Sequence, residues 1–175
     1  DGLDNHRVIM MDSEGNYLSE FGEFGDGPGQ FNGIHALAIG PDGLIFALDR
    51  ANGRVQVFRL TEEASGDYHP EIDHVGIWPG FGLPLDIIVN ERHVWVSDLR
   101  PLKMVKLDFD GNRLYTWNVS DEGLTGYLEV HTFSVDSEGS MYAGDNQHGR
   151  TQKLLPKTDT DPALIIGPPF VSSQR

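Results

Sequence analysis

Two of the seven histidines in this 175-residue chain occupy the same place in a repeated pattern. His35 lies 14 residues before Asp49, and His131 lies 14 residues before Asp145. Imidazole is the commonest metal ligand in proteins, and three imidazoles around one zinc ion leave an open position for water or substrate. The spacing indicates either two zinc ligands or two polar residues at equivalent places, and the residues alone leave both interpretations open.

The pattern that contains these histidines is marked by aspartates that end short apolar runs. They recur at intervals of 48, 49 and 47 residues, at Asp1, Asp49, Asp98 and Asp145. Pro-Asp-Gly and Asn-Gly turns interrupt the sequence too often for helices, but they suit antiparallel strands joined by tight turns. A repeat of roughly 48 residues built only from strands predicts one four-stranded blade of a β-propeller per period.

The chain length corresponds to roughly three and a half periods. We predict an all-β propeller with six blades, of which three and a half to four lie in this chain. An open arc of blades would leave unpaired sheet edges, so we expect N-terminal blades that precede Asp1 to complete the ring; a ring closed by two chains is the alternative. The predicted divisions are a blade remainder at 1–31, blades at 32–83, 84–129 and 130–170, and a tail at 171–175.

The repeat also predicts where the two histidines point. His35 and His131 would begin the innermost strand of alternate blades, and Pro84 takes this place in the blade between them. Alternate blades of a six-bladed ring are about 120° apart, so three such imidazoles would converge on the central channel. This arrangement would suit a three-histidine zinc site, whose third ligand would lie about two periods before His35.

The composition excludes several classes of partner. Asp and Glu number 27 against 13 Lys and Arg, for a net charge of −14. Binding to nucleic acids and to anionic membranes depends on Lys and Arg, so this balance argues against both. No run is long and apolar enough to span a bilayer. The absence of cysteine excludes thiolate zinc sites and leaves the compartment undefined by disulfides; our prediction is a secreted or periplasmic protein.

Two further motifs resemble ligand sites without their essential partners. The glycine-rich stretch Gly22–Gln30 could suggest a phosphate loop, but no helix start follows it, so we predict a connector between blades. Asp108-Phe109-Asp110-Gly111 resembles the front of a calcium loop, but the later ligands and the terminal Glu are missing. We therefore predict a hairpin turn there.

Two segments resemble NHL repeats and, more specifically, the peptidyl-α-hydroxyglycine α-amidating lyase family. They are FNGIHALAIGPDGLIFALDRANGRVQVF and EVHTFSVDSEGSMYAGDNQHGRTQKL. The resemblance covers nearly the whole chain in its repeat pattern and is specific around His35, Asp49-Arg50, Asn52-Gly53-Arg54 and His131. The family has a six-bladed propeller with a channel zinc held by three histidines. It cleaves a peptidyl-α-hydroxyglycine to a peptide amide and glyoxylate.

The resemblance implies that His35 and His131 are zinc ligands and that Arg50 binds and polarises the substrate. A guanidinium suits that task, because it can bind a carboxylate through two parallel hydrogen bonds.

Two departures from the family pattern affect the predicted chemistry. The family's catalytic tyrosine falls in an Asp-Gly-Tyr turn, where this chain has Leu3, which can neither remove a proton nor stabilise an alkoxide. The family's Met-Pro-His-Asp segment is replaced by Glu129-Val130-His131-Thr132, and the lost aspartate weakens the family's structural calcium site. Glu129 is a candidate base or an extra metal ligand, with a solvated rim residue as the alternative.

From these features we predict an NHL-type propeller that acts as a zinc-dependent, lyase-like enzyme on a small carboxylate- or peptide-bearing substrate. The alternative is a non-catalytic NHL propeller that binds a protein or small ligand on its channel face, and a third interpretation is a scaffold or oligomerisation module. The residues that could serve the non-catalytic alternative are Arg54, Arg100, Trp78, Phe81 and Trp95.

Overall fold

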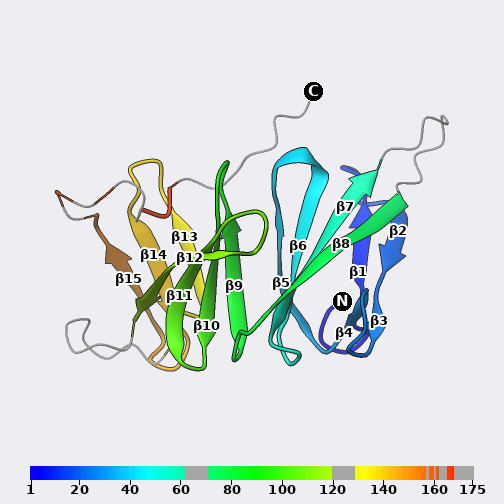
Figure 1. The fold of residues 1–175 in the computed structure, drawn as a ribbon, viewed down its shortest axis with the longest axis horizontal. Helices are drawn as coiled ribbons and strands as arrows, with labels where there is room; N and C mark the ends of the chain where they lie inside the picture. The colour runs from blue at the N-terminus through cyan, green and yellow to red at the C-terminus, as the bar shows by residue number, and fades with distance from the viewer. Residues whose placement is uncertain (62–70, 120–128, 157, 160, 162–164, 168–175) are drawn as a thin grey trace. The chain divides into compact units, whose positions relative to one another are not determined.

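The computed structural model describes residues 1–61, 71–119, 129–156, 158–159, 161 and 165–167. The chain divides into two compact units, Asp1–Gly80 and Phe81–Arg175, and each is described by itself. Strands dominate both units (Figure 1), and within the described residues the helical structure is limited to the short 3₁₀ turn Pro41–Gly43.

The first unit contains one complete four-stranded antiparallel sheet. Its strands follow in chain order: β5 (Ile34–Ile39), β6 (Leu44–Asp49), β7 (Arg54–Thr61) and β8 (Glu71–Pro79). The two middle strands carry nearly continuous buried runs, as expected for strands that are covered on both faces. The predicted antiparallel strands joined by tight turns are therefore confirmed: β5 and β6 are each one residue longer than the apolar runs 35–39 and 44–48, and β7 is four residues longer than the run 55–58.

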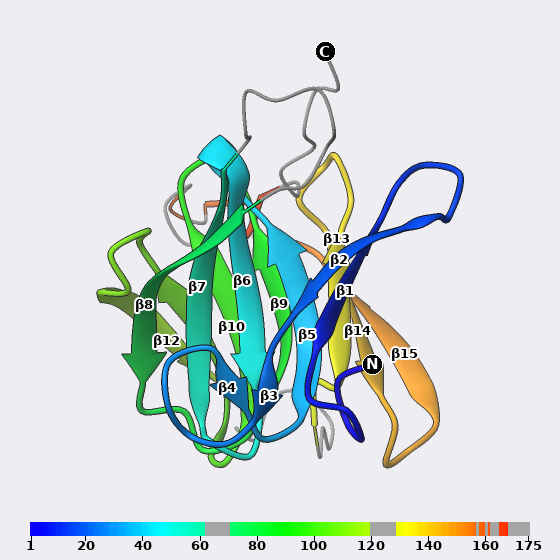
Figure 2. The ribbon, with the colours of Figure 1, turned by 90° about the vertical axis from the view of Figure 1, so that its right-hand side faces the viewer.

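The same unit begins with a hairpin of β1 (Val8–Met11) and β2 (Tyr17–Phe21), which Figure 2 shows as a long twisted ribbon. The predicted connector after this hairpin contains a short parallel pair, β3 (Glu23–Phe24) with β4 (Gln30–Phe31). The stretch leads from β2 into β5, and that it connects two blades stays a prediction. That preceding strands complete the β1–β2 sheet stays a prediction.

The second unit contains a four-stranded and a three-stranded antiparallel sheet, in the orders β12-β11-β10-β9 and β13-β14-β15. The apolar run at 163–166 predicts an outer strand after β15, but residues 163 and 164 lie outside the described residues, and Ile165 and Ile166 are not in a strand. The strands are β9 (Pro84–Val89), β10 (Val94–Leu99), β11 (Leu102–Leu107), β12 (Arg113–Asn118), β13 (Thr132–Val135), β14 (Met141–Asp145) and β15 (Arg150–Leu154).

Three hairpins turn on an aspartate whose carboxylate accepts hydrogen bonds from the backbone N–H groups two and four residues later. These aspartates are Asp12, Asp108 and Asp136. The side-chain amide of Asn112 lowers the pKa of Asp108, with help from these backbone donors. The prediction that Asp108–Gly111 is a hairpin turn is confirmed.

The aspartates that define the repeat each form an ion pair with a base at the start of the next strand. Asp49 pairs with Arg54 at 2.6 Å, Asp98 with Lys103 at 3.3 Å, and Asp145 with Arg150 at 3.7 Å. Asp1 pairs in the same way with Arg7, at 3.0 Å. The first three carboxylates are at most 1% exposed, so the repeat signal in the sequence comes from buried, satisfied aspartates.

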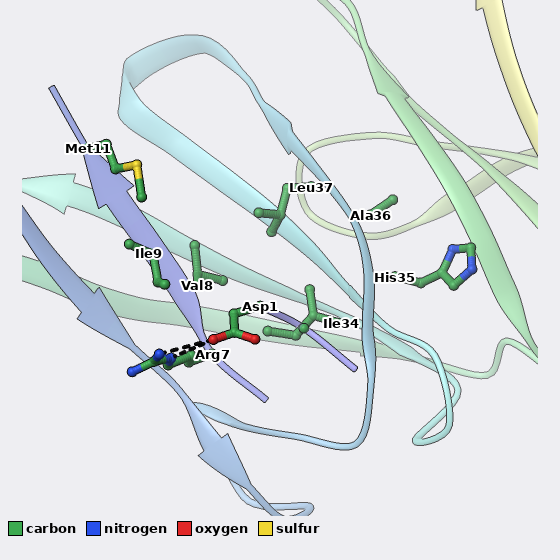
Figure 3. A pocket seen from close by; sticks show the side chains of 10 residues that line it. Asp1, Arg7, Val8, Ile9, Met11, Ile34, His35, Ala36 and Leu37 are labelled. Carbon is green, nitrogen blue, oxygen red and sulfur yellow. Dashed lines mark hydrogen bonds and ion pairs between the residues drawn. The ribbon is translucent and has the colours of Figure 1, made fainter. Parts of the chain in front are cut away.

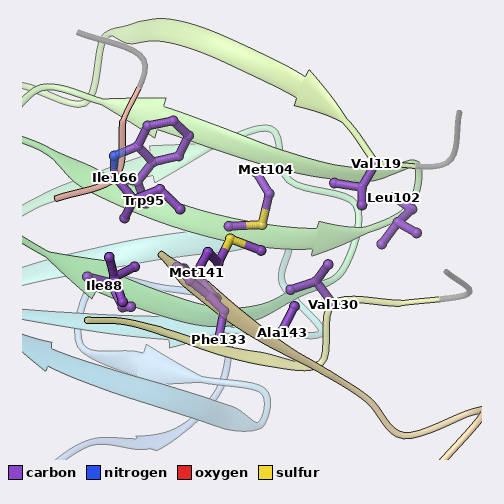
Figure 4. Packing of buried hydrophobic residues seen from close by; sticks show 11 residues of the cluster. Ile88, Trp95, Leu102, Met104, Val119, Val130, Phe133, Met141, Ala143 and Ile166 are labelled. Carbon is purple, nitrogen blue, oxygen red and sulfur yellow. The ribbon is translucent and has the colours of Figure 1, made fainter. Parts of the chain in front are cut away.

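Among the described residues of the second unit, an apolar cluster packs its two sheets face to face (Figure 4). It includes Ile88, Trp95, Leu102, Met104, Val119, Val130, Phe133, Val135, Met141, Ala143 and Ile166. Successive sheets packed through both faces are typical of propeller blades. The all-β class is confirmed and the sheets are consistent with a partial β-propeller, whereas the blade boundaries and the number of blades stay predictions.

Candidate functional site

His35 lies in an irregular part of β5. Ile34 pairs with Asp49 and Leu37 pairs with Ala47, so the ladder shifts by one residue between them. Such bulges change the direction of a side chain relative to the regular alternation of a strand. His35 is half-buried and lies two residues before Leu37.

His131 lies immediately before β13, and its backbone N–H donates to the Gly144 carbonyl at 2.9 Å. It precedes Phe133 by two residues, and Phe133 pairs with Ala143, two residues before the strand-end Asp145. His35 has the same relation to Leu37, Ala47 and Asp49. The two histidines are therefore equivalent in the sheet ladder as well as in the sequence.

The structure corrects the counterpart predicted in the sheet between them. In that sheet Ile87 pairs with Val96, two residues before Asp98, so the equivalent residue is Leu85 rather than Pro84. The β9–β10 hairpin has four residues between its last pair, Val89 and Val94, where the β5–β6 hairpin has five. A count of residues back from the aspartate cannot detect this shorter hairpin, and Leu85 is buried.

The His131 ring is held by two neighbours within the second unit. Its Nδ1 lies 3.0 Å from Oε1 of Glu129 and 3.1 Å from Nδ2 of Asn146. Glu129 is 3% exposed, so the alternative of a solvated rim residue is wrong. Val130, between the two, is fully buried in the apolar cluster and anchors the segment.

The strand that follows His131 is tied to the neighbouring sheet of the same unit. Oδ2 of Asp86 on β9 accepts a hydrogen bond from the Thr132 hydroxyl and another from the Phe133 backbone N–H, both at 2.8 Å. A single carboxylate thus fixes the start of β13, and with it the position of the His131 backbone. The sequence analysis missed this role, because Asp86 belongs to no repeated motif.

Arg50 follows the strand-end Asp49, and its backbone N–H donates to the Gly33 carbonyl at 3.0 Å, two residues before His35. The side chain is partly buried, and within the described residues its buried Nε has no hydrogen-bond partner. A buried guanidinium nitrogen without a partner is costly, which favours a position that a ligand satisfies.

An open groove of about 400 Å³ lies between β1 and β5 in the first unit (Figure 3). Its apolar lining includes Val8, Ile9 and Leu37, and the Asp1–Arg7 ion pair lies at one end. His35 also lines the groove, but its ring points away from that ion pair. The groove is therefore mainly an apolar surface beside β1, and it does not bring together a set of metal ligands.

Leu3, at the place of the family's catalytic tyrosine, is 63% exposed. The preceding Asp1 pairs with Arg7, and Nδ2 of Asn5 lies 2.7 Å from Oδ2 of Asp1. The base lies six residues after Asp1 but five residues after Asp49, Asp98 and Asp145, so this turn is one residue longer than the others, and Leu3 also differs from tyrosine in its side-chain chemistry.

Most of the side chains that could serve the non-catalytic alternative instead hold the sheets and their turns together. Arg54 donates to the Asp49 carboxylate and to the backbone carbonyls of Asp26, Gly27 and Gln30. Trp78, Phe81 and Trp95 are at most 8% exposed, and Arg100 is exposed. Four of these five residues are thus engaged in the sheets or their turns.

The structure adds a residue that the sequence analysis did not select. Nδ1 of His148 lies 2.7 Å from the buried Asp145 carboxylate, and 39% of the His148 side chain is exposed. His148 stands three residues after Asp145, where Asn52 stands after Asp49, so an alignment of the two repeats could have found it.

Among the residues that the structure describes, no three His, Cys, Asp or Glu side chains form a metal-binding group.

The family model of the NHL repeat matches residues 31–58. Peptidylglycine alpha-amidating monooxygenase of Rattus norvegicus is 26% identical over 160 residues, which cover 83% of this chain and 15% of the rat protein. Peptidyl-glycine alpha-amidating monooxygenase B of Xenopus laevis is 26% identical over 171 residues, covering 89% of this chain and 18% of the frog protein. The chain thus spans less than a fifth of the length of these relatives.

Among solved structures, a catalytically inactive variant of virginiamycin B lyase from Staphylococcus aureus, determined with quinupristin, is similar with a TM-score of 0.51. The match covers 87% of this chain and 50% of that chain at 12% identity, and it shows the fold alone. No helix in the described part of the chain has the length and apolar character to cross a membrane. Residues 31–58 thus match the NHL repeat, the fold is consistent with a partial β-propeller, and the chain is similar in sequence to the peptidylglycine alpha-amidating monooxygenases.

Proposed function

We propose that this chain forms part of the channel site of a zinc-dependent, lyase-like propeller. His35 and His131 are the ligands that it contributes to one zinc ion, and the remaining protein ligand comes from outside the described residues. The relationship to amidating enzymes supports a substrate that bears a peptide or a small carboxylate.

The observation that carries this proposal is the environment of His131. Histidines that bind metals usually hold a carboxylate or a carbonyl with their other ring nitrogen, which fixes the orientation of the ring. Glu129 provides this partner at 3.0 Å and is itself buried. His148 has a similar carboxylate partner, so what distinguishes His131 is this partner together with the place in the sheet ladder that it shares with His35.

The second support comes from Arg50, whose buried Nε has no hydrogen-bond partner within the described residues. A substrate carboxylate or carbonyl oxygen would satisfy this donor and would be held close to the His35 segment. Zinc in such a site supplies a Lewis acid and lowers the pKa of a bound water, so Arg50 has the task of orienting the substrate.

Leu3 limits the reactions that this site can perform. A tyrosine hydroxyl could transfer a proton, whereas a leucine cannot, so any proton transfer needs another group. We expect the turnover of a peptidyl-α-hydroxyglycine to be slow, because Leu3 does not supply the hydroxyl that a tyrosine would provide for proton transfer. Cleavage of a peptidyl-α-hydroxyglycine is thus the more specific part of this proposal, and a lyase-like activity in general is the broader part.

Elemental analysis of the purified full chain, followed by zinc titration, tests the metal site. We expect zinc in the wild-type protein and an affinity that is lower by about 100-fold or more in His35→Ala and in His131→Ala, since a lost ligand costs more than a lost outer partner. His93→Gln, in the β9–β10 hairpin, is the matched control and should bind zinc like the wild type. A wild-type protein that binds no zinc would favour the non-catalytic alternative.

Substrate binding is tested with Arg50→Lys and a peptide that ends in α-hydroxyglycine, with the release of glyoxylate as the signal. The ammonium cannot reproduce the planar fork of a guanidinium, so the variant should show a KM that is about tenfold higher with its zinc content unchanged. Equal KM values in the wild type and in Arg50→Lys would show that Arg50 does not bind the substrate. The lack of nucleic-acid binding, the weakened calcium site and the secreted or periplasmic location stay predictions.

A further inference from the structure

The contact between Glu129 and His131 bears on which nitrogen of the His131 ring carries the hydrogen. The Glu129 side chain is 4% exposed, and its Oε1 lies 3.0 Å from Nδ1 of His131. Among the described residues, no other hydrogen bond to this carboxylate is found. A carboxylate buried in this way needs a donor, and the His131 ring is the group that stands at hydrogen-bond distance.

The two neighbours of Nδ1 make opposite demands on that nitrogen. An ionised Glu129 only accepts hydrogen bonds, so Nδ1 must carry a hydrogen to satisfy it. Nδ2 of Asn146 only donates, so it requires a bare Nδ1 with its lone pair. One nitrogen cannot meet both demands at the same time.

Burial decides between the two arrangements. Asn146 is exposed, and water can replace its hydrogen bond at little cost. Glu129 is buried, and within the described part of the chain its carboxylate would lose its hydrogen-bond donor if Nδ1 accepted instead of donating. The Nδ1–H to Oε1 arrangement is therefore the stable one, and the lone pair of His131 resides on Nε2.

We propose that Glu129 is a positioning residue that holds His131 as the Nδ1–H tautomer, so that Nε2 is the nitrogen that binds the metal. The part of this inference that concerns zinc rests on the proposed function, whereas the tautomer follows from the second unit alone. It replaces the role of base or direct ligand predicted for Glu129 with an indirect one, exerted through the imidazole.

The same unit contains an internal reference. His148 places its Nδ1 2.7 Å from the buried Asp145 carboxylate, and its backbone N–H also bonds to that carboxylate. By the same reasoning His148 is an Nδ1–H tautomer, although it stands where the other repeat has Asn52. Its ring signals report whether this end of the sheet stays folded in a variant.

The test is the long-range ¹H–¹⁵N spectrum of the histidine rings in the full chain, recorded at one pH where the rings are neutral and with a chelator present. Wild-type His131 should show a protonated Nδ1 and a bare Nε2. In Glu129→Gln the side chain can donate as well as accept, so His131 should shift toward the Nε2–H tautomer while His148 keeps its pattern. Glu138→Gln is the matched control, since Glu138 is exposed in the β13–β14 hairpin, and it should change neither ring.

A wild-type His131 in the Nε2–H form, or a tautomer unchanged in Glu129→Gln, would overturn the inference. If Glu129→Gln fails to fold, which the His148 signals would reveal, the wild-type spectrum still decides the tautomer.

Zinc competition with a chelating dye separates this inference from the proposed function. We expect Glu129→Gln to bind zinc about 10- to 100-fold more weakly than the wild type, and Glu138→Gln to match the wild type. Equal affinities of wild type and Glu129→Gln would overturn the effect of Glu129 on the metal. A wild type with the expected tautomer but without zinc binding would overturn the proposed function and leave the positioning of His131 intact.

Discussion

The turn after β6 and the turn after β14 begin with the same buried aspartate and surround it differently. Asp49 accepts hydrogen bonds from the Asn32 backbone, from Asn52 and from Arg54, whose guanidinium is itself buried. Asp145 is bonded by the half-exposed His148, and its base Arg150 stays 3.7 Å away with 35% of its side chain exposed. The first turn is closed, and the second is open to solvent.

This difference shows how one repeat position can serve two purposes. In the closed turn every polar neighbour of the carboxylate stabilises the connection between β6 and β7. In the open turn Asn146, directly after the aspartate, reaches the ring of His131 instead. The repeat therefore conserves the geometry of the backbone, while the residues after the aspartate decide whether the turn supports the sheet or approaches the candidate site.

The largest expected effect is on stability when each aspartate is removed. Asp49→Ala leaves the buried Arg54 without its counter-charge and should lower the free energy of unfolding by about 3–5 kcal/mol. Asp145→Ala should cost about 1–3 kcal/mol, because Arg150 is hydrated and the loss is mainly that of hydrogen bonds. Urea unfolding measures both, and Asp4→Ala, at an exposed site, is the control. Equal losses would refute the distinction between a closed and an open turn.

An exchange of the residues three positions after each aspartate should have a smaller and unequal effect. Asn52→His loses one of two hydrogen bonds, since Nδ2 of Asn52 donates both to Asp49 and to the Gly25 carbonyl, at 2.9 Å each. We expect a loss of about 1–3 kcal/mol. His148→Asn can keep its bond to Asp145 at an exposed position and should stay within about 0.5 kcal/mol of the wild type. If both substitutions left the free energy of unfolding unchanged, the surroundings of Asn52 would not contribute to stability.

The smallest effects concern histidines outside the candidate site. Partial burial, followed by the charge of Arg54, lowers the pKa of His74 below its ordinary 6.5. Burial, followed by the charges of Lys106 and Arg92, lowers the pKa of His93, and Asp108 opposes this shift. Because the unfolded chain takes up these protons first, both groups reduce stability as the pH falls below about 6.5 toward the folded-state values.

A ring titration followed by NMR checks these two shifts. In Arg92→Gln the pKa of His93 should rise toward 6.5, while His74, whose shift involves Arg54, should titrate as in the wild type. A pKa of either histidine above 6.5 in the wild type would contradict the assignment.

The strands could be predicted closely because turn chemistry and apolar runs are local. Pro41-Asp42-Gly43 and Asn52-Gly53 bound β5, β6 and β7 within a few residues of the expected ends. The equivalence of His35 and His131 also follows from local counting, since their hairpins have equal lengths. Pro84 was selected wrongly because the β9–β10 hairpin is shorter, and only the pairing of strands reveals that.

The order of residue types along the chain determined the fold class, the period of the repeat and the pair of histidines, since these depend on backbone preferences and on spacing. Tertiary structure decided the roles of the side chains around them. It buried Glu129 against His131, enclosed Arg54 with Asp49, and left the Nε of Arg50 without a partner in the described part of the chain. Burial sets the cost of an unsatisfied charge or donor. Burial depends on how the sheets pack against one another, and the sequence of a single repeat does not specify it.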